Sequence, residues 1–344
     1  MRAVVYAGRG EVRLDDVTEP TVLEPTDAVV RLRRSAVCGT DLHVLAHPEG
    51  LHEGDVLGHE MAGEVVDVGD AVRGVRPGDL VAGSDFTSCG GCWWCRRGDH
   101  WHCPQRRFFG TGTTFGPRLA GCQADLVRVP FADTALRAVP ESLSLDAAVL
   151  LGDTVATGYA AVQRSGLRPG DTLAVVGGGP VGQLTALAAQ ACGAGVVVVV
   201  EPVEARRVLA VSLGALARPP QTARELLLEL TAGRGCDVVV DAVGGPVGLD
   251  TAFSLVRPRG EIVSVGVHHD ETWSLPVARA FREEVGLRFA IGDFARDADA
   301  LTALVAAGTL DPTPVASTSV RLEDAPEAYA EMAARRILKA VIKH

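Results

Sequence analysis

The sequence contains no hydrophobic run of membrane-spanning length and no segment that resembles a targeting signal. Its longest apolar runs, such as Val196–Val200, have only the length of a strand, whereas a membrane-spanning helix needs about 18 apolar residues. Residues 1–14 have the pattern of a strand, a turn and a second strand, rather than a charged segment followed by an apolar stretch. We therefore expect a cytoplasmic protein with no membrane partner.

The sequence also lacks an excess of basic residues. Lys and Arg together number 33 and Asp and Glu number 43, which gives a formal net charge of −10. Nucleic acids and anionic membranes both require a basic face on their protein partner. Because the charges are scattered and form no block of one sign, we expect no nucleic-acid partner.

No internal repeat or low-complexity linker divides the chain, but 344 residues are many for one compact core, so we expect two domains. The N-terminal part consists of short alternating runs between Gly and Pro, which predicts an irregular antiparallel β domain. From Asp171 onward, continuous apolar strands alternate with helical stretches, a pattern typical of a parallel sheet covered on both faces. A helix at 298–307 and a closing strand follow. The predicted fold class is α/β.

Eight cysteines are present, and four of them lie between positions 89 and 103. In a cytoplasmic protein this clustering favours a metal site over disulfide bonds. Four thiolates this close in the chain can complete a tetrahedron around Zn²⁺, and such a closed shell is structural, not catalytic. The alternatives are an iron–sulfur cluster, or a site in which His100 or His102 replaces one sulfur. The predicted ligands of the structural zinc are Cys89, Cys92, Cys95 and Cys103.

A strand that ends at position 176 is followed by the pattern G-x-G-x-x-G at the start of a helix, the context that a dinucleotide site requires. Gly177 would form the tight turn, Gly179 would let the backbone approach the pyrophosphate, and Gly182 would let the helix pack on the strand. Glu201 ends the next strand, where a carboxylate binds ribose hydroxyls and repels a 2′-phosphate. This favours NAD over NADP, although Arg206 or Arg207 could pair with such a phosphate. A turn that binds another nucleotide, or none, is the alternative.

Two further segments, Cys38-Gly-Thr-Asp-Leu-His43 and Gly58-His59-Glu60, carry residue types that bind metals but that would mean little alone. Together with the four cysteines and the glycine turn, they resemble the zinc-containing alcohol dehydrogenases of the medium-chain dehydrogenase/reductase superfamily. The motifs R-P-G-D at Arg76–Asp79 and T-G-Y at Thr157–Tyr159 extend the resemblance over nearly the whole chain.

The resemblance implies that Cys38 and His59 bind a catalytic zinc. The third ligand of the family comes from a short segment before T-G-Y, where many members have Cys and this sequence has Asp153. This resembles the branch related to bacterial formaldehyde dehydrogenases, in which an Asp is the ligand; the alternative role of Asp153 is a helix N-cap. One thiolate, one carboxylate and one neutral imidazole carry the same charge as two thiolates and an imidazole. The ion would therefore stay acidic enough to stabilise an alkoxide.

The resemblance also implies how the neighbouring residues act. Glu60 would support the ligands or bind the ion transiently during water exchange, and Asp41 would orient His59 through its free ring nitrogen. The Thr40 hydroxyl would take the proton of a zinc-bound alcohol and pass it through the cofactor ribose to His43, which would release it to solvent. The alternative for His43 is a solvated surface residue outside any relay.

By the same resemblance, we expect a β-rich GroES-like catalytic domain at 1–153 with its structural-zinc lobe at 86–106, a doubly wound parallel-sheet Rossmann domain at 154–292, and a return to the catalytic domain at 293–344. We expect a homo-oligomer, a tetramer rather than a dimer. The residues expected to bind the cofactor are Gly177, Gly179, Pro180, Val181, Gly182, Glu201, Arg206, Thr157, Val243, Val265 and Val267.

The predicted activity is hydride transfer between a small alcohol, secondary or polyol-like, and NAD(P), with two zinc ions per chain. The sequence leaves the substrate and the physiological direction open. Two classes of protein are alternatives to this activity: a zinc-bearing binding or scaffold protein without turnover, and a zinc-free enoyl or quinone reductase of the same superfamily. Metal content separates them, because a count below two would remove either the catalytic scheme or the structural lobe.

Overall fold

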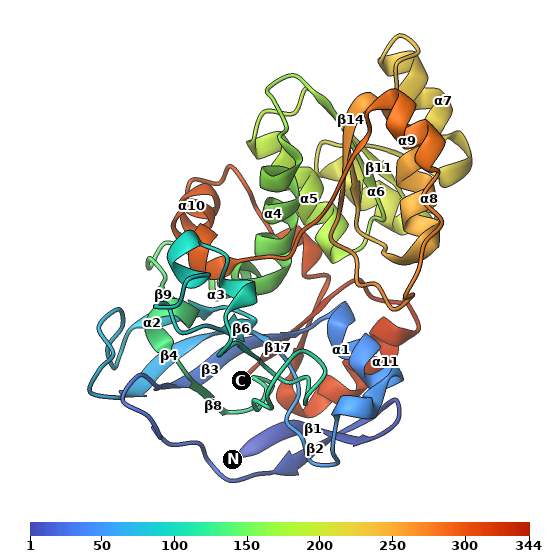
Figure 1. Cartoon of the computed structure of the whole chain (residues 1–344). Helices are drawn as coiled ribbons and strands as arrows, with labels where there is room; N and C mark the ends of the chain where they lie inside the picture. Colours follow the sequence, from blue (N-terminus) through green and yellow to red (C-terminus); the bar gives the residue numbers. More distant parts are fainter. The chain divides into compact units, whose positions relative to one another are not determined.

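The computed structural model describes residues 1–344, and Figure 1 shows the course of the chain. The chain forms two compact units. Unit 1 contains Met1–Asp153 and Asp293–His344, and unit 2 contains Thr154–Gly292. C-terminal residues therefore complete a unit that the N-terminal residues begin.

Unit 1 is built around a seven-stranded mixed sheet in the order β16-β17-β3-β4-β5-β9, with β8 paired to β3. Neighbouring strands are antiparallel, as predicted, except β16 and β17, which are parallel. The strands of this sheet are β3 (Ala28–Val37), β4 (Glu60–Val68), β5 (Leu80–Gly83), β8 (Leu126–Val129), β9 (Leu136–Ala138), β16 (Thr318–Arg321) and β17 (Ala340–Lys343). Two small sheets pair β1 (Arg2–Gly8) with β2 (Glu11–Asp16) and β6 (Phe86–Thr87) with β7 (Arg107–Phe108).

The core of unit 1 follows from the alternation of side chains along its strands. In β3, Val30 and Leu32 are buried in a hydrophobic cluster, whereas Arg31 and Arg33 are exposed. The predicted helix at 298–307 begins earlier, at Phe294. The helices of unit 1 are α1 (Gly39–Ala46), α2 (Ala132–Ala135), α3 (Leu145–Leu150), α10 (Phe294–Ala306) and α11 (Ala325–Ala333).

A continuous helical segment, Leu145–Ser165, carries the chain from unit 1 into unit 2. It consists of α3, a π-helical turn at Leu151–Val155 and α4 (Ala156–Ser165). Its length and composition would suit a membrane span, but 72% of its most apolar window is buried inside the protein. Asp153 lies in the π turn, a distortion that occurs often at functional sites. The N-cap position of the following helix, α4, is Val155, so the alternative role of Asp153 as a helix N-cap is wrong.

Unit 2 contains a six-stranded parallel sheet in the order β12-β11-β10-β13-β14-β15, which confirms the predicted doubly wound fold. The chain starts at β10, proceeds to one edge, and crosses back to β13 and the other edge. In such sheets, ligands bind at the carboxyl ends of the strands where the order reverses. The strands are β10 (Thr172–Val176), β11 (Val196–Val200), β12 (Leu216–Arg218), β13 (Cys236–Asp241), β14 (Val256–Ser264) and β15 (Gly286–Phe289). After α4, the helices are α5 (Pro180–Ala191), α6 (Glu204–Ser212), α7 (Pro220–Leu230), α8 (Gly245–Leu255) and α9 (Val277–Glu283).

Candidate active site

Three metal-ligand residues from distant parts of the sequence converge in unit 1. Cys38 lies between β3 and α1, His59 precedes β4, and Asp153 lies in the π turn. The distance from Cys38 Sγ to Asp153 Oδ2 is 3.3 Å, and His59 Nε2 is 3.3 Å from the same oxygen. One ligand atom from each residue lies within 4.8 Å of the other two. The three predicted ligands therefore form one group.

This group fits a zinc ion. A thiolate, an imidazole and a carboxylate are all zinc ligands, and three of them leave a fourth position open, as in catalytic sites. His59 Nε2 is buried and forms no hydrogen bond, as expected of a nitrogen whose partner is a metal ion. Burial, aided by the charge of Asp153, raises the pKa of the Cys38 thiol. A divalent cation supplies the positive charge that a thiolate needs in such a place.

A carboxylate supports two of the ligands. Asp41 Oδ1 is 3.1 Å from His59 Nδ1, the ring nitrogen that does not face Asp153. Asp41 Oδ2 accepts a hydrogen bond of 2.9 Å from the backbone N–H of Cys38. One side chain therefore hydrogen-bonds the segment that carries the thiol and lies within ion-pair distance of the imidazole ring, a position from which a buried carboxylate can orient a metal-binding histidine.

Two residues behind Asp41 were not predicted. The amide nitrogen of Gln123 lies 3.4 Å from Asp41 Oδ2, and Gln123 Oε1 accepts a hydrogen bond of 2.8 Å from the Tyr329 hydroxyl. Both side chains are buried. No motif marks them, because they come from segments far from Asp41 in the sequence.

Glu60 is completely buried and forms an ion pair with Lys339, which is also completely buried. Lys339 Nζ in addition donates a hydrogen bond of 3.3 Å to the carbonyl oxygen of Val37. Sequence analysis did not find Lys339, which stands just before β17. A lysine before a closing strand has no pattern that distinguishes it from an exposed one.

Helix α1 places the two predicted relay residues on one face, since they are three positions apart. The Thr40 hydroxyl is 4.0 Å from Cys38 Sγ. Cys38 is buried, Thr40 is half-buried and His43 is exposed. The side chains of α1 thus extend from the ligand group to the surface.

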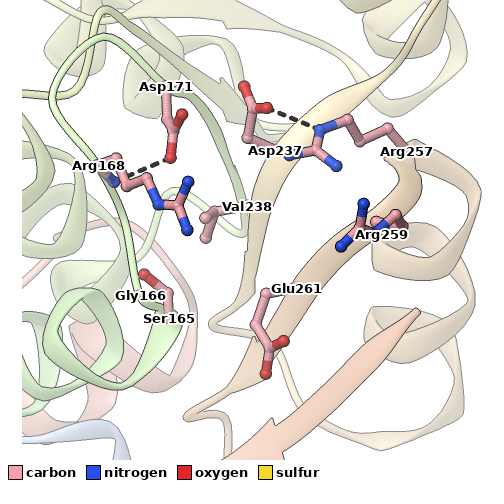
Figure 2. Close-up of a pocket in the computed structure, with 9 residues that line it drawn as sticks. All are labelled: Ser165, Gly166, Arg168, Asp171, Asp237, Val238, Arg257, Arg259 and Glu261. Carbon is pink, nitrogen blue, oxygen red and sulfur yellow. Dashed lines mark hydrogen bonds and ion pairs between the residues drawn. The ribbon is translucent and has the colours of Figure 1, made fainter. Parts of the chain in front are cut away.

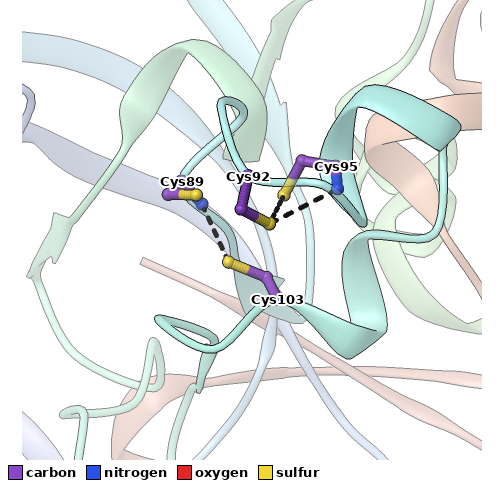
Figure 3. A group of neighbouring side chains, drawn as sticks. All are labelled: Cys89, Cys92, Cys95 and Cys103. Atoms are coloured by element: carbon purple, nitrogen blue, oxygen red, sulfur yellow. Dashed lines mark hydrogen bonds between the residues drawn. The ribbon is translucent and has the colours of Figure 1, made fainter.

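The four clustered cysteines lie in the segment between β6 and β7, and Figure 3 shows their side chains turned toward one another. One Sγ atom from each lies within 4.8 Å of the other three. Backbone N–H groups, first that of Cys95, lower the pKa of Cys92 to about 7, which favours the thiolate form that binds metal. The alternative ligands are not used: His100 Nδ1 is 2.9 Å from Asp293, and the ring of His102 packs on Trp94. The residues of this group are Cys89, Cys92, Cys95 and Cys103.

In unit 2, the glycines of the predicted turn have the geometry that a dinucleotide site needs. Gly177 has a φ of +97°, a conformation that favours glycine. A Cβ at Gly182 would lie 1.8 Å from the carbonyl oxygen of Gly177, so only glycine lets α5 pack this closely. A Cβ at Gly179 would meet open space, so there is room for a pyrophosphate to approach the backbone at this glycine. Pro180 and Val181, both half-buried, form the first turn of α5, whose N-terminus presents free N–H groups to an anion.

Glu201 lies at the carboxyl end of β11 and is 3% exposed. Its carboxylate accepts hydrogen bonds from the backbone N–H groups of Gly178 (2.7 Å) and Val203 (2.8 Å). Arg206 Nη1 lies 3.9 Å from Glu201 Oε2. The carboxylate is therefore part of the glycine turn itself, with the arginine beside it.

The other predicted cofactor residues also belong to unit 2. Val243 follows β13 and is 51% exposed, and Val265 and Val267 follow β14 and are half-buried. These positions lie at the carboxyl ends of their strands. Thr157 lies in the first turn of α4, where its Oγ1 packs close to Gly292.

The structure adds a polar chain beside these residues that sequence analysis did not assign. The Ser264 hydroxyl donates to Asp241 Oδ2 (2.7 Å) and lies 2.8 Å from His268 Nε2. His268 Nδ1 accepts a hydrogen bond of 3.0 Å from the N–H of Gly245. This chain fixes the backbone after β13 and β14.

Figure 2 shows a cavity of about 340 Å³ at the opposite edge of the unit 2 sheet, where β10, β13 and β14 begin. Its three arginines and three acidic residues balance in charge, and Arg257 pairs with Asp237 at 2.7 Å. Gly177 follows the other end of β10. The cavity is therefore separate from the glycine turn and carries no predicted site residue.

Comparison with known proteins agrees with the metal-ligand groups of unit 1 and the dinucleotide turn of unit 2. The family model "Alcohol dehydrogenase GroES-like domain" matches residues 24–141, and "Zinc-binding dehydrogenase" matches residues 180–307. A probable zinc-binding alcohol dehydrogenase of Mycobacterium tuberculosis is 36% identical over 336 residues, which cover 97% of this chain and 86% of that protein. The chain belongs to the zinc-containing alcohol dehydrogenases of the medium-chain dehydrogenase/reductase family.

Solved structures of related alcohol dehydrogenases have the same fold. The alcohol dehydrogenase TADH from Thermus sp. ATN1 matches with a TM-score of 0.96 and 35% identity over 100% of this chain and 99% of that one. A putative zinc-binding dehydrogenase from Sinorhizobium meliloti, bound to NADP, matches with a TM-score of 0.87 and 26% identity over 100% and 99%. By sequence, the chain is also similar to a sorbitol dehydrogenase of Bacillus subtilis, with 30% identity over 274 residues, which cover 78% of this chain and 75% of that one.

The family membership confirms the predicted enzyme class. The protein is a zinc-dependent NAD(P) alcohol dehydrogenase that acts on small alcohols or carbonyl compounds. It has two zinc sites, a structural one of four cysteines and a catalytic one of Cys38, His59 and Asp153.

Proposed function

We propose that this alcohol dehydrogenase interconverts secondary alcohols or polyols and their carbonyl compounds, with NAD as the preferred cofactor. The observation that carries the proposal is the convergence of Cys38, His59 and Asp153 beside Thr40. The Asp ligand supports a relationship to the branch of formaldehyde dehydrogenases in which an Asp is the ligand. The polyol class is supported by the likeness to a sorbitol dehydrogenase.

The residues of the chain have separate tasks in this reaction. When bound, zinc supplies Lewis acidity to the alcohol oxygen, and the nicotinamide carries the hydride. Asp41 fixes the ring and tautomer of His59. The Thr40 hydroxyl holds the proton that the alcohol loses, and His43, one turn further along α1, delivers it to solvent. Glu60, held by Lys339, supports the ligand segments and is available as a transient ligand.

The cofactor preference is argued from Glu201. A carboxylate at the end of β11 repels a 2′-phosphate, and its two hydrogen bonds to the backbone keep it in place. Arg206 is close to this carboxylate, so the positive charge of Arg206 is partly compensated and attracts a 2′-phosphate less. The cofactor contacts then come from the glycine turn with Pro180 and Val181, and from Thr157, Val243, Val265 and Val267.

We assign unit 1, with residues 1–153 and 293–344, as the catalytic domain and unit 2, residues 154–292, as the cofactor domain. A homotetramer is proposed because unit 2 exposes apolar side chains at one edge. Phe281 on α9 is 84% exposed and Phe289 on the edge strand β15 is 62% exposed. Apolar side chains at an unpaired strand edge are a usual place for a second copy to bind. None of the eight cysteines forms a disulfide bond, which fits a cytoplasmic enzyme.

The test is a zinc determination followed by a spectrophotometric panel of alcohols and carbonyl compounds with NAD and NADP. We expect two zinc ions per chain and a change in reduced-nicotinamide absorbance with secondary alcohols or polyols, faster with NAD. Zinc-replete protein that turns over none of them would favour a zinc-bearing binding or scaffold protein. Turnover of primary alcohols alone would contradict the substrate class.

A further inference from the structure

One buried carboxyl group close to the catalytic site has no task in the mechanism above. Asp85 lies between β5 and β6 and is 5% exposed. Its side chain accepts one hydrogen bond, of 3.2 Å, from the Ser84 hydroxyl. No arginine or lysine forms an ion pair with it. A buried carboxyl group normally has several polar partners, so Asp85 has hydrogen-bonding capacity to spare.

The backbone around Asp85 is packed against the zinc ligand Asp153. A Cβ added to Gly152 would lie 1.8 Å from the carbonyl oxygen of Gly83 and 3.3 Å from Cα of Ser84. The end of β5 therefore touches the residue that precedes Asp153. This contact brings Asp85 into the immediate surroundings of the ligand group.

On its other side, Asp85 adjoins an aromatic wall. Its carbonyl oxygen accepts a hydrogen bond of 3.1 Å from the N–H of Phe109. The ring of the preceding residue, Phe108, lies 5.2 Å from the ring of His59. Phe108 also contacts Trp101 and Phe115. The surroundings of the ligand group thus combine aromatic rings with the carboxyl group of Asp85, which is not a ligand, is not paired with a lysine and, unlike Asp41, does not contact a ligand residue.

The charged groups around Asp85 leave its carboxyl group able to bind a hydroxyl group. Arg106, whose charge interacts with Asp85, stacks on Trp101 and donates its hydrogen bonds to the carbonyl groups of Trp101 and Phe115. Burial, together with the charge of Asp153, raises the pKa of Asp85 well above its ordinary value. A carboxylic acid both donates and accepts hydrogen bonds, and a carboxylate accepts them, so either form can bind a hydroxyl group.

We propose that Asp85 determines specificity by binding a second hydroxyl group of the substrate, so that vicinal diols and polyols react in preference to simple secondary alcohols. This inference rests on the proposed function and names the residue that selects among its substrates. An alcohol without the second hydroxyl leaves the buried carboxyl group unpaired, and sites of this kind discriminate strongly against such analogues.

The experiment compares butane-2,3-diol with butan-2-ol, which have the same carbon skeleton and differ by one hydroxyl group. Both are assayed with the zinc-replete wild type and with Asp85→Ala, Asp85→Leu and Asp85→Asn. We expect Asp85→Ala and Asp85→Leu to lower kcat/KM for the diol by roughly 10- to 100-fold while kcat/KM for butan-2-ol stays equal or rises. Asp85→Asn keeps a group that bonds hydroxyls and should retain part of the preference.

Zinc content serves as the control, since every variant should keep two ions per chain. An equal fall of kcat/KM on both alcohols, or no change on either, would overturn the role of Asp85 while the proposed function stood. Loss of the catalytic zinc from Asp85→Ala and Asp85→Asn alike would also overturn it, because the residue would then support the metal site. A wild type that oxidises neither alcohol would reject the proposed substrate class, and this inference with it.

Discussion

The ammonium group of Lys339 lies between the carboxylate of Glu60 and the carbonyl oxygen of Val37, and both charged side chains are completely buried. Val37 precedes the ligand Cys38, and Glu60 follows the ligand His59. Burial alone would lower the pKa of Lys339, but Glu60 and the neighbouring acidic groups raise it above its ordinary value. The lysine therefore stays charged and joins the two segments that carry the thiol and the imidazole.

Replacing Lys339 with Met should destabilise the protein strongly, because the Glu60 carboxylate would remain buried without a partner. Breaking a buried ion pair by removing one member costs roughly 3–5 kcal/mol. Urea unfolding of zinc-replete protein measures this change. The double variant Lys339→Met/Glu60→Gln removes both charges and should recover most of the loss. A single variant as stable as the wild type would show that the pair holds nothing in place.

The ligand role of Asp153 can be tested with the structural zinc as an internal reference. Asp153→Asn keeps the shape of the side chain but removes its charge, which leaves one thiolate to balance the ion. We expect the catalytic zinc to be lost on dialysis, so that the zinc count falls from two to one, and kcat/KM to fall by roughly 100-fold or more. Asp153→Cys restores the charge with a zinc-binding atom and should retain the second ion. A count of two for Asp153→Asn would contradict the assignment.

The sequence predicted those features whose residues lie close together or recur at a fixed spacing. The cysteines at 89–103 needed no other part of the chain to reveal a metal site, and the glycines after β10 fell between a strand and a helix. Asp153 was located through a resemblance to a family, since the π turn around it has no sequence pattern of its own.

The residues that sequence analysis missed all act through contacts between distant segments. Lys339 and Glu60 are 279 positions apart, and Tyr329 and Gln123 are 206 apart. A buried lysine or glutamine has the same local pattern as an exposed one, so only the packed structure distinguishes it. The parallel pair of β16 and β17 was missed for the same reason, because the direction of strand pairing is set by the path of the whole chain.

Glu201 should control the choice between the two cofactors. Glu201→Ser removes the charge that repels a 2′-phosphate and releases Arg206, which lies 3.9 Å from the carboxylate. We expect the ratio of kcat/KM with NADP to that with NAD to rise by roughly tenfold or more, since a charged hydrogen bond contributes about 1.5–3 kcal/mol. The control is Glu201→Ser/Arg206→Ala, which should lose the gain with NADP. An unchanged ratio in the single variant would mean that the carboxylate serves only the glycine turn.

His344 should make the protein sensitive to acid. His344 is half-buried, its Nε2 lies 2.9 Å from the Ser35 hydroxyl, and loss of contact with water lowers its pKa from 6.5 to about 4. As the pH falls through 6.5, the unfolded chain takes up a proton at this histidine while the folded protein does not. Stability is therefore complete above pH 6.5 and is lost progressively down to about pH 4, by about 3 kcal/mol in all.

The measurement is the free energy of unfolding of wild type and His344→Gln at intervals between pH 7 and pH 4. The amide of Gln can still bond to Ser35 but does not titrate, so the variant should lose less stability over this range. Carboxylates far from His344, such as Asp237, whose pKa is lowered by hydrogen bonds from the Thr172 backbone and Arg257, also lose their contribution in acid, but they do so equally in both proteins and cancel in the difference. The difference between the two curves should change between pH 6.5 and pH 4 and be flat above. Parallel curves throughout would show that His344 is protonated as readily in the folded protein as in the unfolded chain.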